Sequence, residues 1–381
     1  MKKSVKTAIS LFMVLITVSA MLFAVSCGRA PGEMPAANQN DDGYAYPTFM
    51  PFPEINGAQK NGRETDVSPG DENKVASRLT GMPIDADDSN RRPLAFVINN
   101  MFRALPQSGV AHADIIYEVL AEGDITRLIA IVQCYAQIEK IGPIRSARDY
   151  FVQFALDYDA VFIHHGGSPS GYRLLNTLRA DRVDAMTCGA FWRCPVRSVQ
   201  PGMMEHSSYT DAANLIKEME RTKIRSELNG GGRFGFSFGS GYMRPDPDAA
   251  RADRITVPFS RNYTRTFLYN ADGLYEVHNR DGAHIDMETG ETLTVSNVLI
   301  QSVRMRVIPG DSEGRREVGA VGEGGGYLAT AGGYIRIKWS KADDFSPTVW
   351  TKEDGTELVL TAGKTWICVL SENEKAVFGN E

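Results

Sequence analysis

Apolar and polar positions recur along the chain with periods that predict strands and helices. Residues 93–100 form an apolar run that ends in two asparagines, which is typical of a buried strand followed by a polar turn. Residues 115–122 alternate between apolar and polar side chains, and residues 127–133 do so again after the turn at Gly123 and Asp124. Two such runs around a glycine turn predict a β-hairpin.

Helical spacing begins further along the chain. Residues 146–158 carry aromatic and apolar side chains at helical intervals, which predicts a helix. A short apolar run at residues 160–163 predicts a strand, which leads through a Gly-rich turn into a second helix ending near Leu178. A third helix is expected over about 210–221, with Ser208 or Thr210 as its cap.

The pattern changes after about Pro245. Helical periods end there, and short strand-like runs alternate with glycine-containing turn signals at a spacing of about ten residues. We therefore predict an α+β protein. A mixed α/β layered domain would occupy residues 91–240, and a smaller antiparallel β-rich domain would occupy residues 245–372.

The N-terminus has the charge order of a secretory signal. Lys2, Lys3 and Lys6 precede an uncharged, largely apolar run over residues 7–26, and small residues then lead into Cys27. We predict that residues 1–26 are a lipoprotein signal peptide and that Cys27 carries a lipid. The alternative is an uncleaved signal anchor, because about 20 apolar residues span a bilayer. Both interpretations place the remainder of the chain outside the cytoplasm.

Residues 27–90 are rich in Pro, Gly, Asn, Asp and Glu and have no sustained apolar period, which predicts a disordered tether. Without the three lysines of residues 1–26, the chain has 38 basic and 47 acidic residues, a net charge of about −9. This balance argues against a general binder of nucleic acid or of anionic membranes. Cys188 and Cys194 could close a short disulfide loop or remain free thiols.

Several short segments resemble those of one family, and they occur in order over roughly residues 78–370. They are Leu79-Thr80-Gly81-Met82-Pro83, Pro106-Gln107-Ser108-Gly109, Ala113-Asp114-Ile115-Ile116-Tyr117-Glu118, Gly142-Pro143-Ile144-Arg145-Ser146-Ala147-Arg148, Gly166-Gly167-Ser168, His284-Ile285-Asp286 with Thr289-Gly290, and Gly363-Lys364-Thr365-Trp366-Ile367. Together they resemble the YerB-like bacterial lipoproteins. The resemblance implies an exported lipoprotein with a mixed α/β first domain, and it supplies no agreed activity.

Arginines at a predicted helix start are the first candidate for chemistry. Arg145 and Arg148 are three residues apart, so a helix would place them on one face, where backbone N–H groups also favour an anion. We expect Arg103, Arg127 and Asn99 to join them in a site for phosphate or carboxylate. In the alternative interpretation the arginines form internal ion pairs with nearby acidic residues, namely Asp114, Glu118, Glu122 and Asp149.

Histidines at a predicted strand end are the second candidate. His164 or His165 could act as a general base, with Ser168 as a polar or nucleophilic group and Glu118 or Glu122 as an acid. The alternative is a hydrogen-bonded structural histidine and a Ser168 that caps the next helix. No complete catalytic motif is present in the sequence.

We expect no metal and no cofactor. The acidic and histidine residues that could converge, among them His206, lack the spacing of known metal motifs. Residues 230–235 match G-x-G-x-x-G, but they precede a strand-like run instead of opening a helix, so a dinucleotide site is rejected.

Taken together, the sequence favours a non-enzymatic, membrane-tethered, extracytoplasmic lipoprotein of the cell envelope. Its ligand would be an anionic envelope component, such as an envelope glycopolymer or a lipid-linked precursor, or a cell-wall assembly protein. The alternative is a hydrolase or transferase that modifies envelope polymers, using a histidine base and an arginine-lined anion site.

Overall fold

The computed structural model describes residues 38–39, 45–46, 73–229, 234–239 and 249–379. Residues 1–67 and 68–381 form two separate units. In the first, strands β1 (Asn38–Gln39) and β2 (Ala45–Tyr46) pair in antiparallel fashion. The predicted signal peptide, Cys27, most of the predicted tether and residues 230–233 of the Gly-rich segment lie outside the described residues. No helix among the described residues is long and apolar enough to span a membrane.

Residues 73–90 of the second unit, which the composition assigned to the tether, contain regular secondary structure. Strands β3 (Lys74–Ala76) and β4 (Pro83–Asp85) pair with each other, and the short helix α2 (Ala86–Ser89) follows. Leu79 lies between the two strands and is fully buried. Leu79 and a hydrogen bond from the amide of Gly363 to the carbonyl of Thr80 (2.7 Å) hold this polar segment to the body, and its average composition does not reveal this.

The N-terminal half of this unit contributes five strands to a central sheet: β5 (Leu94–Asn99), β6 (Ile115–Leu120), β7 (Thr126–Val132), β8 (Val161–His164) and β9 (Arg182–Asp184). The predicted β6–β7 hairpin is confirmed, with Ile115 opposite Ile131. Every residue of β5, β6 and β7 is buried. Both faces of these strands are therefore covered, although the sequence of β6 and β7 alternates between apolar and polar side chains.

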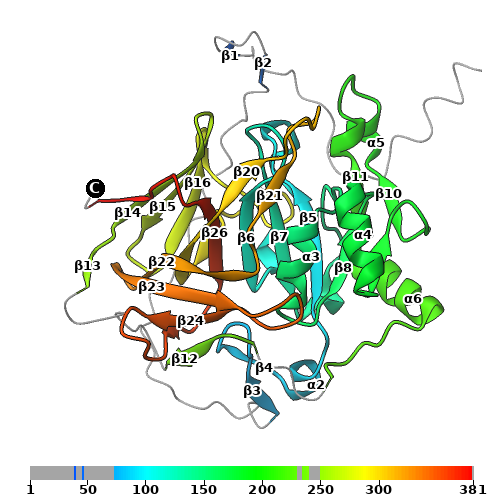
Figure 1. Cartoon of the computed structure of the whole chain (residues 1–381). Helices are drawn as coiled ribbons and strands as arrows, with labels where there is room; N and C mark the ends of the chain where they lie inside the picture. Colours follow the sequence, from blue (N-terminus) through cyan, green and yellow to red (C-terminus); the bar gives the residue numbers. More distant parts are fainter. Residues whose placement is uncertain (1–37, 40–44, 47–72, 230–233, 240–248, 380–381) are drawn as a thin grey trace, which may run out of the picture. The chain divides into compact units, whose positions relative to one another are not determined.

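The C-terminal half extends the same sheet. Its strands are β13 (Ala250–Arg251), β19 (Asn297–Val303), β22 (Gly322–Thr330), β23 (Gly333–Lys341), β24 (Val349–Lys352) and β26 (Thr365–Ser371). Most of them pair antiparallel, as predicted. Strand β26 instead runs parallel to both β19 and β6, with Thr365 opposite Ile115. One sheet therefore continues through both halves (Figure 1).

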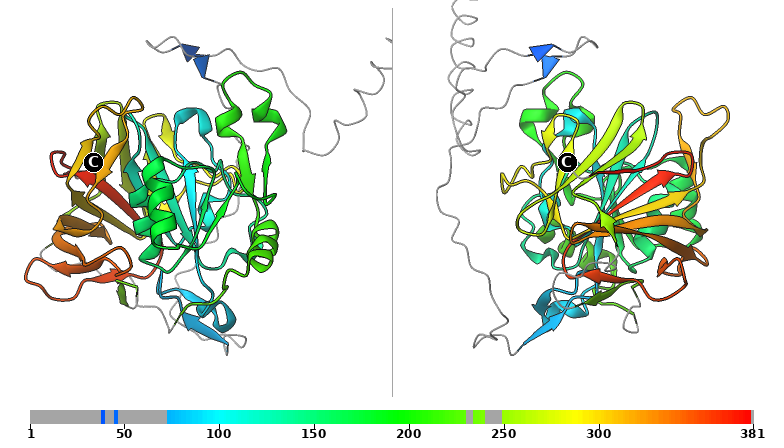
Figure 2. Two further views of the ribbon diagram at one scale, coloured as in Figure 1. Left: turned by 45° about the vertical axis from the view of Figure 1, so that its right-hand side comes forward. Right: turned by 90° about the vertical axis from the view of Figure 1, so that its left-hand side faces the viewer.

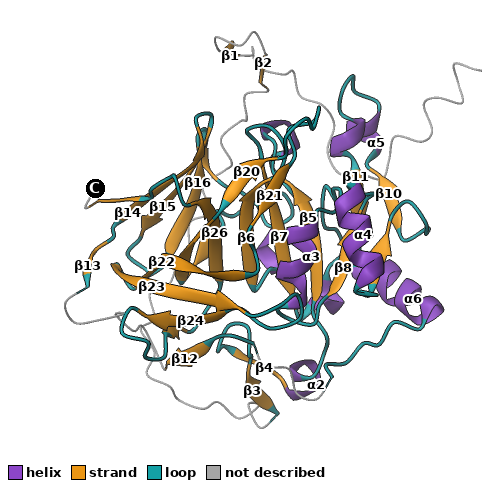
Figure 3. Cartoon of the chain, in the orientation of Figure 1, coloured by secondary structure: helices purple, strands orange, loops and turns teal. Residues whose placement is uncertain are grey.

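Helices are gathered on the strands of the N-terminal half, whereas the C-terminal half consists of strands and loops (Figure 3). Helix α3 (Asp149–Leu156) covers β7 and β8 and packs against α4 (Pro169–Thr177). The ring of Phe154 on α3 stacks on Tyr117 of β6, with centroids 4.6 Å apart. Helix α6 (Ala212–Thr222) begins at its cap Asp211, whose carboxylate accepts from the amide of Asn214, so the predicted caps Ser208 and Thr210 are wrong.

A second, antiparallel sheet contacts the central one on the C-terminal side. It is built from β14 (Arg254–Ser260), β15 (Tyr263–Tyr269), β16 (Tyr275–Asn279), β17 (Gly282–Ala283), β18 (Thr294–Val295) and β27 (Val377–Gly379). Smaller pairs are formed by β12 (Ser237–Gly239) with β25 (Val359–Thr361) and by β20 (Met305–Val307) with β21 (Arg316–Val318). The two halves thus meet along β6, β26 and β14.

Buried polar side chains tie the halves together. Glu118 on β6 is fully buried and accepts hydrogen bonds from Arg265 on β15 and from the indole N–H of Trp366 on β26. Arg265 also donates to Nδ1 of His284, whose Nε2–H therefore donates to Oε1 of Gln107, 2.6 Å away. Burying a charge is strongly unfavourable unless it is paired, so this network favours one arrangement of the two halves.

Candidate functional site

The segment between Ile141 and Arg148 lies across the ends of the central strands and positions the arginines predicted for anion binding. The amide of Ile144 donates to the carbonyl of Ser208, and that of Arg145 donates to the carbonyl of Val97 on β5. The amide of His165, just after β8, donates to the carbonyl of Arg145 at 3.0 Å. These three hydrogen bonds fix the backbone from which the side chain of Arg145 extends.

The prediction that the two arginines of this segment share one helical face is wrong. Arg148 has extended backbone angles, φ −128° and ψ 155°, and is the N-cap of α3, so the helix begins only at Asp149. An extended backbone directs nearby side chains to different sides. Arg145 consequently enters a surface cavity, whereas the guanidinium of Arg148 is buried against Glu122.

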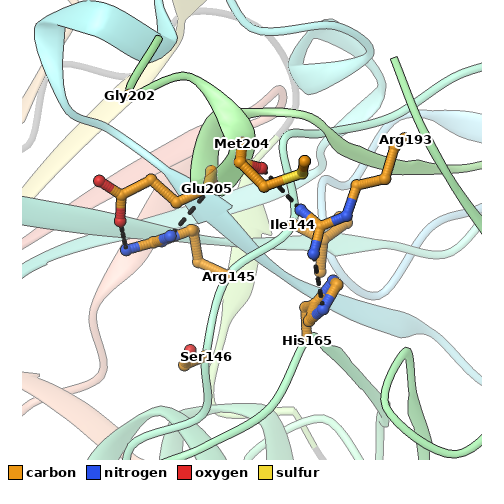
Figure 4. Close-up of a pocket in the computed structure, with 8 residues that line it drawn as sticks. All are labelled: Ile144, Arg145, Ser146, His165, Arg193, Gly202, Met204 and Glu205. Atoms are coloured by element: carbon orange, nitrogen blue, oxygen red, sulfur yellow. Dashed lines mark hydrogen bonds and ion pairs between the residues drawn. The ribbon is translucent and has the colours of Figure 1, made fainter. Parts of the chain in front are cut away.

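The cavity around Arg145 has a volume of about 350 Å³. Figure 4 shows two pairs of side chains in its lining: Arg145 is turned toward Glu205, and Arg193 is turned toward His165. Its full lining is Ile144, Arg145, Ser146, His165, Arg193, Gly202, Met204 and Glu205. Arg193 closes β10 (Phe191–Arg193), which pairs with β11 (Ser208–Thr210), and the loop between these strands supplies the last three lining residues.

Both guanidiniums in the cavity have protein partners. Arg145 lies 2.9 Å from the Glu205 carboxylate through Nη2 and donates through Nη1 to the Glu205 carbonyl at 3.0 Å. Arg193 donates through Nη1 to the carbonyl of Met204 at 2.7 Å. Burial, together with the charge of Arg145, lowers the pKa of Arg193. The charge of Arg145 thus acts on Arg193, so an added anion would be stabilised here.

His165 is hydrogen-bonded at both ring nitrogens. Arg193 can only donate, so Nε2 of His165 is the acceptor of its 3.1 Å contact, and Nδ1–H donates to Oγ of Ser208 at 2.7 Å. Burial and the charge of Arg193 lower the pKa of His165. The imidazole is therefore neutral near pH 7, and its lone pair is already engaged by Arg193.

Positive charge also lies behind the cavity. Arg127 and Arg148 are both buried and share the carboxylate of Glu122, and both donate to the carbonyl of Ser146. Burial and the charge of Arg148 lower the pKa of Arg127 to about 9. Burial alone would raise the pKa of Glu122, but the charges of Arg127 and Arg148 outweigh it and lower that pKa. The single carboxylate of Glu122 forms ion pairs with two guanidiniums, which leaves excess positive charge at this end of the sheet.

The other predicted binding residues lie nearby. Asn99, at the end of β5, donates through Nδ2 to Nδ1 of His206 at 2.7 Å and accepts from the amide of Met101. The guanidinium of Arg103 lies beside Gly202 at the rim of the cavity. Arg145 thus lines the cavity, Arg103 and Asn99 lie around it, and Arg127 and Arg148 lie behind it.

The predicted catalytic groups are not brought together. His164 is fully buried, with Nδ1–H donating to the carbonyl of Gly166 at 2.8 Å. The hydroxyl of Ser168 caps α4 by accepting from the amide of Gly171 at 3.0 Å. Glu118 belongs to the interface between the halves, and Glu122 belongs to the arginine pair. In the described ranges, no three His, Cys, Asp or Glu side chains form a group that could hold a metal, and Cys188 and Cys194 are free thiols.

Arg193 and Glu205 were missed by the sequence analysis. Arg193 lies in a segment that suggested only a possible disulfide loop, and Glu205 lies in a loop without periodicity. The one signal for Arg193 is that Phe191 and Trp192 precede it as a short strand pattern. Only the pairing of β10 with β11 brings it within reach of His165.

Comparison with known proteins agrees with the resemblance noted from the sequence. Residues 79–225 match the N-terminal domain, and residues 255–367 the C-terminal domain, of a family described as "Protein of unknown function (DUF3048)". A Bacillus subtilis (strain 168) protein named "Putative lipoprotein YerB" is 32% identical over 322 residues, which is 82% of this chain and 92% of that protein. The crystal structure of the YerB protein from Bacillus subtilis superposes with a TM-score of 0.68 at 30% identity, covering 80% of this chain and all of that one. The chain therefore belongs to the DUF3048 family, and it is similar over most of its length to the Bacillus subtilis protein named "Putative lipoprotein YerB".

Proposed function

We propose that this protein is a membrane-anchored, extracytoplasmic lipoprotein that binds an anionic group of a cell-envelope component in the Arg145–Arg193 cavity, without chemically transforming it. The observation that carries the proposal is the convergence of two guanidiniums in one open cavity. Among the described residues that line the cavity, Glu205 alone is acidic, and its side chain is 53% exposed.

The geometry suits an oxyanion such as phosphate or carboxylate. Guanidinium groups present paired N–H donors that match these anions. The buried pair Arg127 and Arg148 adds a positive potential from behind, where screening by salt is weak. An entering anion would displace the Glu205 carboxylate from Arg145 and leave the backbone contacts of both arginines in place.

The proposed attachment to the membrane rests on the N-terminal sequence and on the relative's name. The lysine-rich start, the apolar run and Cys27 have the order of a lipoprotein signal. The related Bacillus subtilis protein is named a putative lipoprotein. A lipid on Cys27 would hold the acidic body at the outer face of the membrane by a covalent anchor, so the body itself would need little attraction to lipid.

Binding is favoured over catalysis because the candidate catalytic groups are engaged in structural contacts. The lone pair of His165 is occupied by Arg193, and Ser168 lies at a helix cap. A general base needs a free lone pair within hydrogen-bonding reach of its substrate. The cavity offers donors for an anion instead.

The proposal is tested by anion binding to the full-length protein in detergent. Titration calorimetry with inorganic phosphate should detect one site, and the variant Arg145→Gln plus Arg193→Gln should bind at least about ten-fold more weakly, because each charge-assisted hydrogen bond contributes about 1.5–3 kcal/mol. Arg251→Gln is the matched control, since that arginine is 65% exposed on β13, at the other end of the central sheet.

Equal phosphate affinity in the double variant and the parent would overturn the proposed site. Cleavage of a muropeptide or of a lipid phosphate at a rate that falls in His165→Gln would overturn the non-enzymatic part of the proposal.

A further inference from the structure

The loop that joins β10 to β11, residues 194–207, exposes apolar side chains, and we call it the tip. It carries the short helix α5 (Pro195–Ser198) and the 3₁₀ turn η4 (Met204–His206). Val196, Val199 and Met204 are 64%, 81% and 54% exposed. Figures 1 and 2 show the tip standing out beyond the neighbouring strands. Apolar side chains gathered at a projecting point indicate a contact surface.

The exposure of the tip is fixed by hydrogen bonds. Arg197 is turned back toward the body and donates to the carbonyls of Ala104 at 2.8 Å and Pro106 at 3.0 Å. Its neighbours Val196 and Val199 are left on the outside. The amide of Ser198 also donates to the carbonyl of Cys194, which closes the first turn. The structure thus holds these apolar groups in water.

The tip and the cavity are continuous. Met204 is an exposed residue of the tip and also lines the cavity, and Glu205 follows it as the partner of Arg145. Figure 4 shows Met204 next to Arg193, which donates a hydrogen bond to its carbonyl oxygen. A surface that presents apolar side chains next to an opening lined by guanidiniums is complementary to the head-group layer of an anionic bilayer.

We propose that the tip enters the interfacial layer of a phospholipid bilayer, while the cavity at its base takes the phosphate of an anionic lipid head group. This inference rests on the proposed anion site, since it names the source of the anion. Val196, Val199 and Met204 would lie at the boundary between head groups and acyl chains.

The net charge of the body limits this contact to the tip. The mature chain carries about −9, so most of its surface is repelled by anionic lipid. A lipid anchor on Cys27 would keep the tip at high effective concentration near the bilayer. A contact of only three apolar side chains would then be enough to keep the tip at the bilayer surface.

Hydrogen–deuterium exchange of the full-length, lipidated protein in proteoliposomes tests this inference. Vesicles of phosphatidylcholine mixed with phosphatidylglycerol are compared with vesicles of phosphatidylcholine alone. The amides of residues 196–205 should exchange several-fold more slowly in the anionic vesicles only. Val196→Ser plus Val199→Ser should abolish this protection, whereas Val349→Ser plus Val377→Ser, a matched pair that is 48% and 62% exposed elsewhere on the body, should retain it.

Calorimetry with inorganic phosphate separates the two proposals, because neither valine of the tip lines the cavity. Tip amides that are equally fast in both vesicle types, with phosphate still bound, would overturn the bilayer contact and leave the anion site standing. Protection that is equal in both vesicle types would overturn the role given to the anionic head group. Loss of phosphate binding in the tip variant would overturn the division of roles between tip and cavity.

Discussion

The guanidinium of Arg265 lies against the carboxylate of Glu118, with Nε 2.8 Å from Oε2 and Nη2 3.0 Å from Oε1. Both side chains are fully buried, and they come from opposite halves of the chain. A bidentate pair of this kind fixes both distance and orientation. It also defines the position of β15 against the face of β6.

Glu118→Gln should lower the free energy of unfolding by about 3–5 kcal/mol, because it leaves the guanidinium of Arg265 buried without a charged partner. Urea unfolding of the full-length protein measures the change. Glu276→Gln is the control: its side chain is 38% exposed and pairs with His278, so the loss should stay below about 1 kcal/mol. Equal losses in the two variants would contradict the importance given to the buried pair.

His284 should make stability fall on acidification. Burial and the charge of Arg265 hold its pKa well below 6.5, so below pH 6.5 the unfolded chain binds a proton that the folded chain does not. Stability therefore rises with pH through this window, with a contribution of up to about 1.4 kcal/mol per pH unit. In His284→Gln this slope between pH 6.5 and 5.5 should be shallower by that amount. Parallel stability curves for parent and variant would rule the effect out.

Glu205→Gln should strengthen phosphate binding several-fold, because the carboxylate that competes for Arg145 becomes neutral while the backbone contact stays. Calorimetry measures the affinity. Glu317→Gln removes a carboxylate of similar exposure, 50%, which pairs with Arg306 on the β20–β21 hairpin, and should leave the affinity unchanged. Weaker binding in Glu205→Gln would show that Glu205 holds the site in shape instead of competing for it.

Gly326→Ala should destabilise the sheet by about 1–3 kcal/mol, because the added Cβ would lie 2.0 Å from the carbonyl oxygen of Ile300 on the paired strand β19. Gly325→Ala tests the adjacent position, where the nearest atom to an added Cβ is 3.9 Å away, and should be tolerated. Thermal unfolding of both variants gives the comparison, and similar melting temperatures would refute it.

Much of the N-terminal half could be predicted from local periodicity. The β6–β7 hairpin, the strand β8 and the helices α4 and α6 fall where the sequence placed them. Helix α3 begins later than predicted because Arg145–Arg148 is held extended by the carbonyl of Val97 and the loop after β8. Those partners are distant in sequence, so no local pattern reports them.

The cavity was only half predictable for the same reason. Arg145 stood out by its position after a Gly-Pro turn, but its neighbours Arg193 and Glu205 come from strand β10 and the loop that follows it, about 50–60 residues further on. For Glu118, the sequence suggested a role that its contacts in the structure do not support. Its charge on a strand suggested a proton donor, whereas its partner Arg265 is almost 150 residues away and makes it part of the interface.

The position of β26 has a consequence for how the chain is made. Strand β6 is synthesised early, yet its neighbour in the sheet begins about 250 residues later, at Thr365. Until that strand has emerged, β6 has one unpaired edge, and Glu118 lacks the indole of Trp366. A chain that stops short of Trp366 therefore leaves both an open strand and a carboxylate that lacks its indole donor, so truncated copies should be recognised and degraded instead of accumulating as a working first half.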